Sequence, residues 1–150
     1  MPLLTGSLRP TELALLADAR RAVLATRKPD GGARLVPITF AFDGDTGLLY
    51  FALDEKPKSV ADPRDLARVR DIATSPQVSV LVDRWSEDWS ELAWLRLDGE
   101  ATLLEPADHA EEHAWALALL RRRYPQYEKQ ALERRPMVRV EVQRTASWGL

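Results

Sequence analysis

The sequence contains no cysteine and only two histidines among its 150 residues. Without cysteine it has no disulfide, no thiol nucleophile and no thiolate metal site. No apolar run approaches the ~20 residues that span a bilayer, and the first residues lack the charged-then-apolar order of a signal peptide. We therefore expect a cytoplasmic protein that does not associate with a membrane.

The sequence also lacks an excess of one charge. Its 21 basic and 23 acidic residues leave a formal net charge of −2, whereas proteins that bind nucleic-acid backbones usually carry a basic excess. Gly-x-Gly-x-x-Gly and Walker patterns are absent, so nothing supports a Rossmann or P-loop nucleotide site. The hydrophobic share of 45% is ordinary for a globular protein. We expect a single domain over residues 1–150 and no nucleic-acid partner.

The first half of the chain alternates strand-like runs with turns rich in Gly and Asp. The runs cover residues 23–26, 34–42 and 48–53 and contain many β-branched and aromatic side chains. This pattern predicts an antiparallel meander. Pro37 cannot donate to a sheet ladder, which predicts an edge strand or a bulge with backbone amides free for a ligand.

A basic segment follows the meander. Lys56 and Lys58 are two residues apart, so in an extended chain both ammonium groups can converge on one anion. The next residues, 65–73, predict a short helix that ends before Pro76. On such a helix Arg68 and Arg70 point in different directions, so we expect only one of them to reach the anion.

The second half predicts further strands and helices. We expect a buried strand at 78–82, a long strand at 92–104 bulged at Gly99, and a last strand at 137–142. Helices are expected at 10–19 and from an Asp108 cap to Arg123. A polar loop between the strands expected at 78–82 and 92–104 carries Trp85 and Trp89. Tryptophans on polar loops tend to lie at interfaces or to stack on planar ligands.

The segment from His109 to His113 matches the zinc-peptidase pattern H-x-x-E-H. Two histidines four residues apart share one helix face. The sequence has no third histidine and no cysteine, and short motifs recur by chance in Glu- and Ala-rich helices. We therefore expect no metal site.

The order of short motifs resembles a known family. The matching stretches are Leu24-Ala25-Thr26, Pro29-Asp30-Gly31, Val36-Pro37-Ile38-Thr39-Phe40, Tyr50-Phe51, Lys56-Pro57-Lys58-Ser59 and residues 75–83. In this order they look like the pyridoxamine 5'-phosphate oxidase-like flavin-binding split β-barrel family, over roughly residues 11–148. The stretches Asp83-Arg84-Trp85, Glu87-Asp88-Trp89 and Arg96-Leu97-Asp98-Gly99 are similar to its actinobacterial branch associated with the deazaflavin coenzyme F420.

This resemblance implies a fold, an assembly and an activity. The fold is a mainly β (α+β) split β-barrel with six or more mostly antiparallel strands and peripheral helices. The assembly is a homodimer with the site at the subunit interface. The activity is F420-dependent hydride transfer involving a small unsaturated or aromatic substrate. The implied cofactor-binding residues are Thr26, Val36, Pro37, Ile38, Thr39, Lys56, Lys58, Ser59, Arg68 or Arg70, Asp83, Trp85 and Trp148.

Other interpretations remain open at this stage. The same fold could bind FMN through the same phosphate-binding residues, or it could carry a flavin, haem or bilin without catalysis. Trp148 is either near the flavin-type ring or a terminal residue folded onto the surface. No residue stands out as a catalytic acid or base, because hydride transfer to a bound acceptor needs none of its own.

Overall fold

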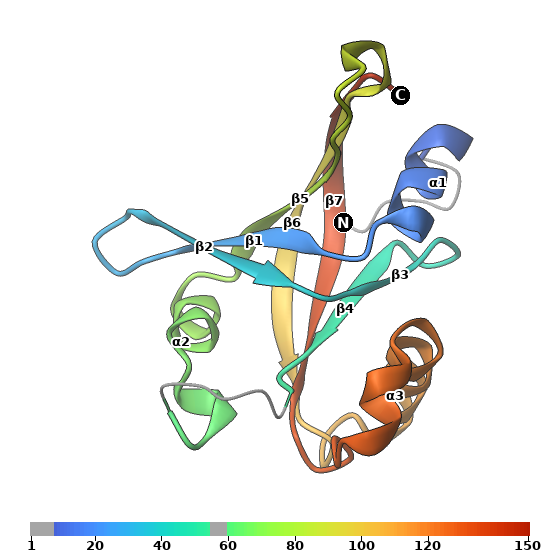
Figure 1. The fold of residues 1–150 in the computed structure, drawn as a ribbon. Helices are drawn as coiled ribbons and strands as arrows, with labels where there is room; N and C mark the ends of the chain where they lie inside the picture. Colours follow the sequence, from blue (N-terminus) through green and yellow to red (C-terminus); the bar gives the residue numbers. More distant parts are fainter. Residues whose placement is uncertain (1–7, 55–59) are drawn as a thin grey trace.

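The computed structural model describes residues 8–54 and 60–150, which form one antiparallel sheet with helices around it (Figure 1). The strands are β1 (Ala22–Arg27), β2 (Ala33–Ile38), β3 (Ala41–Asp43), β4 (Leu48–Ala52), β5 (Gln77–Arg84), β6 (Ala93–Leu104) and β7 (Met137–Trp148). The α-helices are α1 (Pro10–Asp18), α2 (Ala67–Thr74) and α3 (Ala110–Arg123), and the 3-10 helices are η1 (Pro63–Asp65), η2 (Trp89–Glu91) and η3 (Pro125–Lys129). No helix within these ranges is long and apolar enough to cross a bilayer.

The seven described strands follow the order β2-β1-β5-β6-β7-β4-β3, and every pairing is antiparallel. The sheet curls around its apolar face (Figure 1). The expected mainly β split barrel with peripheral helices is therefore confirmed. At one end of the long strands β5, β6 and β7, the loop between β5 and β6 lies beside the C-terminus (Figure 1).

The run at 34–42, expected as one strand, forms two. Strand β2 pairs with β1, whereas β3 pairs with β4. Between them the amide of Phe40 donates to the hydroxyl of Tyr124 at 3.1 Å, because buried backbone that leaves a ladder needs another partner. The expected meander is therefore wrong, since the two hairpins lie at opposite ends of the sheet. The edge position expected for Pro37 is confirmed, because β2 is a terminal strand.

Alternating side chains form the core. Val138, Val140 and Val142 of β7 are fully buried on one face, as expected. They pack in a cluster that includes residues of α1, α2 and all strands except β3. A second cluster joins α3 to Tyr50 of β4 and Leu104 of β6. Tyr50 alternates with Leu49 and Phe51 of the first cluster, so the two clusters lie on opposite faces of β4. Helix α3 therefore covers the face opposite that of α1 and α2.

The first and last α-helices differ in detail from the expected ones. Leu13 of α1 is 36% exposed, while Glu12 and Leu16 are buried. Glu12 can be buried because Ser147 on β7 donates to it at 2.7 Å. Helix α3 begins after His109, not after Asp108, and no side chain caps its first turn. The expected Asp108 cap is therefore wrong.

The helix expected at 65–73 is preceded by a separate 3-10 helix. Arg64 lies in η1, whereas α2 begins at Ala67. Arg64 donates two hydrogen bonds of 2.7 Å to Glu105 at the end of β6. Arg64 therefore has an anionic partner within the chain.

The bulge expected at Gly99 is confirmed. The β6–β7 register shifts there, so that Asp98 pairs with Arg144 and Gly99 with Val142, which leaves Gln143 as the extra residue. A Cβ atom at position 99 would lie 2.1 Å from the carbonyl oxygen of Glu141. Only glycine permits this close approach of β6 to β7.

On β2, β1 and β5 the face opposite the first cluster carries apolar side chains that stay exposed in this single chain. Val23, Leu35 and Leu81 are 37%, 67% and 40% exposed, and Val23 pairs directly with both Leu81 and Pro37. We call this area of β2, β1 and β5 the open face. A contiguous apolar area of this kind is typical of a surface that another molecule covers.

Candidate functional site

Helix α2 lies beside the β1–β2 hairpin (Figure 1), and its Asp71 places a buried carboxylate against Thr26 and Arg34. Asp71 is 4% exposed, and one of its oxygens accepts hydrogen bonds of 2.7 Å from the Thr26 hydroxyl and from Arg34 Nε. Burial by itself raises the pKa of Asp71, but the hydrogen bonds from Arg34 and Thr26 outweigh it and lower the pKa. Asp71 therefore stays ionised and fixes both side chains.

The two arginines of α2 have different environments. Arg70 is exposed, whereas Arg68 is partly buried and its Nε makes no hydrogen bond to any described residue. Burial lowers the pKa of Arg68, and the negative charge of Asp54 partly offsets this effect. Asp54 immediately precedes residues 55–59. Because buried guanidinium groups normally have acceptors, this environment fits an anionic group such as a phosphate.

Several predicted site residues line two cavities that share Asp83. Asp83, Trp85 and Trp148 line a cavity of about 450 Å³ at the end of β5, β6 and β7. Val36, Pro37 and Asp83 line another of about 370 Å³ on the open face. Trp85 and Trp148 are 66% and 54% exposed. The fold thus brings together residues from β2, β5, the β5–β6 loop and the chain end.

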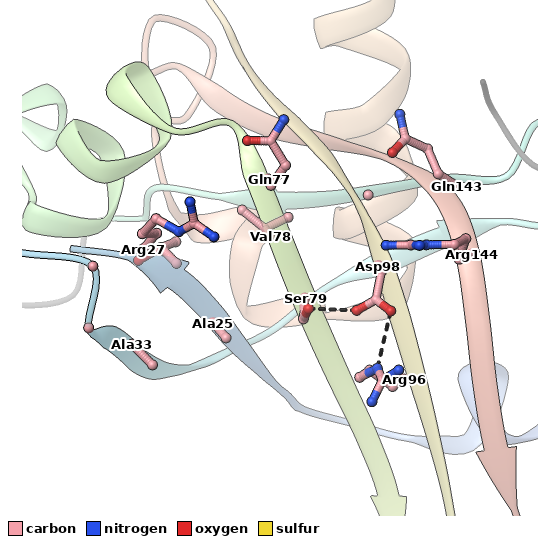
Figure 2. A pocket seen from close by; sticks show the side chains of 14 residues that line it. Ala25, Arg27, Ala33, Gln77, Val78, Ser79, Arg96, Asp98, Gln143 and Arg144 are labelled. Carbon is pink, nitrogen blue, oxygen red and sulfur yellow. Dashed lines mark hydrogen bonds and ion pairs between the residues drawn. The ribbon is translucent and has the colours of Figure 1, made fainter. Parts of the chain in front are cut away.

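A third cavity of about 490 Å³ lies where β1, β5, β6 and β7 meet the β1–β2 turn (Figure 2). Its charged lining residues are Arg27, Arg96, Arg144 and Asp98. Asp98 accepts a hydrogen bond of 2.6 Å from Ser79 and one of 3.2 Å from Arg96 Nε. Three arginines and one carboxylate line this cavity, so its electrostatic potential favours anions. Of the predicted residues that the structure describes, only Thr26 lines it.

Ile38 and Thr39 do not line these cavities. Ile38 is 8% exposed and belongs to the core. The Thr39 hydroxyl lies 2.6 Å from the hydroxyl of Tyr127. Lys56, Lys58 and Ser59 lie outside the described residues.

Two side chains of the zinc-peptidase pattern have structural partners, whereas the buried Nδ1 of His109 makes no hydrogen bond to a described residue. His113 is 2% exposed, and its Nε2 lies 2.6 Å from the carbonyl oxygen of Arg135. Glu112 accepts hydrogen bonds from Tyr50 at 2.9 Å and from Arg139 at 2.6 Å. Among residues 8–54 and 60–150, no group of three or more His, Asp or Glu side chains is placed to bind a metal.

The sequence patterns did not indicate Arg34, Asp71 or Tyr127 as residues of the site. Arg34 carries a signal, because it is a basic residue two positions before Val36 and therefore shares its strand face. No sequence pattern indicates a role for Asp71 or Tyr127. Their partners Thr26 and Thr39 are 45 and 88 positions away in the sequence.

Solved structures with a similar fold belong to proteins with different functions. The chain is similar to an F420 reductase, with 20% identity, a TM-score of 0.65, and coverage of 93% of this chain and 98% of that one. It is similar to an FAD-binding protein from Mesorhizobium loti, with 22% identity, a TM-score of 0.63, and coverage of 93% and 94%. It is also similar to the haem storage protein HutZ from Vibrio cholerae, with 13% identity, a TM-score of 0.68, and coverage of 97% and 94%. At these identities the likeness shows the fold alone.

Comparison of the sequence with family profiles is more specific than the likeness of folds. Among curated proteins none matches this chain. The sequence profile named pyridoxamine 5'-phosphate oxidase matches residues 8–149, which is nearly the whole chain and includes every strand and helix described above. The chain therefore belongs to the pyridoxamine 5'-phosphate oxidase family.

Proposed function

We propose that this protein is an F420-dependent oxidoreductase that transfers a hydride between the deazaflavin and a small unsaturated or aromatic substrate. Family membership and the similarity to an F420 reductase support an oxidoreductase. The observation that carries the proposal is the gathering of Val36, Pro37, Asp83, Trp85 and Trp148 around two cavities that share Asp83. These residues come from segments that only the fold brings together.

In this proposal the chain binds and orients the cofactor, which supplies the hydride chemistry when bound. Arg68 provides a partly buried positive charge beside the segment that holds Lys56 and Lys58, and these three residues bind the phosphate or the acidic tail. The main chain of β2 near Val36 contacts the ring. Trp85 and Trp148 cover the cavity with large apolar surfaces and reduce the access of water.

We further propose that a second copy of the chain covers the open face, with the site at the subunit interface. The exposed Val23, Leu35 and Leu81 support this arrangement, since an interface core is apolar. One of the site cavities continues this area, because Leu35 and Leu81 line the same cavity as Asp83. Sedimentation velocity at micromolar concentration tests this part. A monomer under these conditions would contradict it.

Cofactor binding tests the central proposal. The purified protein is titrated separately with F420 and FMN while tryptophan fluorescence is followed, because Trp85 and Trp148 line the proposed site. We expect micromolar or tighter binding of F420. Binding of FMN alone would identify FMN as the cofactor in place of F420, in line with the fold shared with an FAD-binding protein. Binding of neither cofactor would refute the proposal.

The arginines of α2 provide a matched pair of variants. We expect Arg68→Gln to weaken cofactor binding by about 1.5–3 kcal/mol, the scale of a hydrogen bond to a charged group. Arg70→Gln is the control, because Arg70 is exposed and lies on the same helix. Equal affinities of the two variants would remove Arg68 from the proposed phosphate site.

A non-catalytic carrier is the second candidate function, and the similarity to a haem storage protein supports its consideration. Haem binding would require an accessible histidine. His113 is 2% exposed and its Nε2 contacts a backbone carbonyl, so it is poorly placed. An absorbance titration with haemin tests this candidate, and a Soret band that survives His109→Ala would exclude His109 as the ligand.

A further inference from the structure

The hydroxyl of Tyr127 joins two segments of the proposed cofactor site. Tyr127 lies in η3 and is 3% exposed. Its hydroxyl donates to Asp54 Oδ2 at 2.9 Å and lies 2.6 Å from Thr39 Oγ1. A phenol has one proton to donate. Because that proton goes to Asp54, the Thr39 hydroxyl donates to Tyr127.

The two partners of Tyr127 occupy different parts of the proposed site. Thr39 directly follows β2, whose main chain is proposed to contact the ring. Asp54 directly precedes the segment with both lysines, and its charge acts on Arg68 of α2. The side chain of Tyr127 therefore links Thr39, at the end of β2, to Asp54.

The backbone of Leu53 and Asp54 is held by a second side chain, that of Arg135. Arg135 donates from Nε to the carbonyl oxygen of Leu53 at 2.6 Å and from a terminal nitrogen to that of Asp54 at 2.9 Å. These bonds fix the backbone at this point, while Tyr127 fixes the direction of the Asp54 carboxylate. Burial raises the pKa of Tyr127, so the phenol stays protonated and remains a donor.

We propose that Tyr127 is a positioning residue that fixes the Asp54 carboxylate and thereby keeps Arg68 available to the phosphate of the cofactor. This inference rests on the proposed function. Without the hydroxyl, the Asp54 carboxylate loses a buried donor and turns toward other partners, including the Arg68 guanidinium. Arg68 is then less available to a phosphate, whereas the proposed ring contacts of β2, Trp85 and Trp148 do not involve Asp54.

The test compares ligands that share a ring but differ in the phosphate. Dissociation constants are measured for FMN and riboflavin, and for F420 and its phosphate-free riboside. In Tyr127→Phe we expect the advantage of the phosphate-bearing ligand over its phosphate-free partner to fall about tenfold, the lower end for a hydrogen bond to a charged group. A variant that only loosens the fold would weaken both ligands alike and leave this ratio unchanged.

Tyr124→Phe is the matched control. Its hydroxyl is also buried and accepts a hydrogen bond from the Phe40 amide at 3.1 Å, but it contacts neither Thr39 nor Asp54. We expect this control to keep the wild-type ratio between the dissociation constants of the phosphate-free and phosphate-bearing ligands. Thr39→Val is a second control, because it removes the bond to Thr39 but keeps the bond from Tyr127 to Asp54, and we expect it to keep the wild-type ratio as well. An unchanged ratio in Tyr127→Phe would overturn the inference. Failure of the wild-type protein to bind any of the four ligands would overturn the proposed function and the inference with it.

Discussion

Replacement of Gly99 by alanine tests the close approach of β6 and β7 at the bulge. The added Cβ would lie 2.1 Å from the Glu141 carbonyl oxygen, 2.9 Å from its carbonyl carbon and 3.1 Å from Val142 Cα. These atoms are backbone, so no rotamer change can relieve the contacts. The strands have to separate locally by about 1 Å to reach an ordinary van der Waals distance.

Such a separation has a sizeable energetic effect. Overpacking of a close-packed interior costs about 1–3 kcal/mol, and we expect about 3 kcal/mol here because the neighbouring atoms are backbone. A 150-residue domain is typically stable by about 7–15 kcal/mol and loses roughly 2–4 °C of melting temperature per kcal/mol. The melting temperature of Gly99→Ala should therefore fall by about 6–12 °C.

Thermal and urea unfolding, followed by tryptophan fluorescence, provide the measurement. Gly44→Ala is the control, because its added Cβ would meet only Leu13 Cδ2 at 3.5 Å, an ordinary contact. We expect this control to stay within about 1 kcal/mol of the wild type. If Gly99→Ala and Gly44→Ala unfold at the same urea concentration, the reasoning about the bulge is wrong.

Two further predictions concern buried carboxylates. Asp71→Asn keeps the shape of the side chain but removes its charge, so Arg34 loses its ion-pair partner. We expect a loss of about 2 kcal/mol in urea unfolding, and an unchanged midpoint would contradict the structural role of this pair. Acid should destabilise the protein through Asp71 and Glu12, whose folded-state pKa values are both lowered. Their contribution is present above the unfolded pKa values of about 3.9 and 4.3 and is lost as the pH falls through the folded values. The urea midpoint should fall below about pH 5, and Glu12→Gln should flatten this dependence.

Local patterns were sufficient for most elements of the fold. The β-branched runs, the turn glycines and the helix ending before Pro76 all correspond to observed elements. The bulge at Gly99 was predictable because an isolated glycine in a strand pattern usually marks close backbone approach. The division of residues 34–42 was not predictable from the pattern. It depends on the Phe40 amide finding Tyr124, which is 84 positions away.

The candidate site was predictable only in part. The motif order identified Asp83, Trp85 and Trp148, and the fold places these residues around one cavity. Sequence spacing left Arg68 and Arg70 as alternatives, because both lie on the same short helix. Their burial separates them, and burial depends on how α2 packs against β1 and β6.

The sequence alone determined the type and position of the strands, the need for glycine at the bulge and the presence of two neighbouring lysines before α2. These properties depend on backbone conformations and side-chain alternation within a few residues. The tertiary structure decided the pairing order of the strands, the burial of Arg68 and the contacts of Tyr127 with Thr39 and Asp54. Such contacts join residues far apart in the chain, and their geometry is set by the packing of the curled sheet and its helices rather than by local sequence.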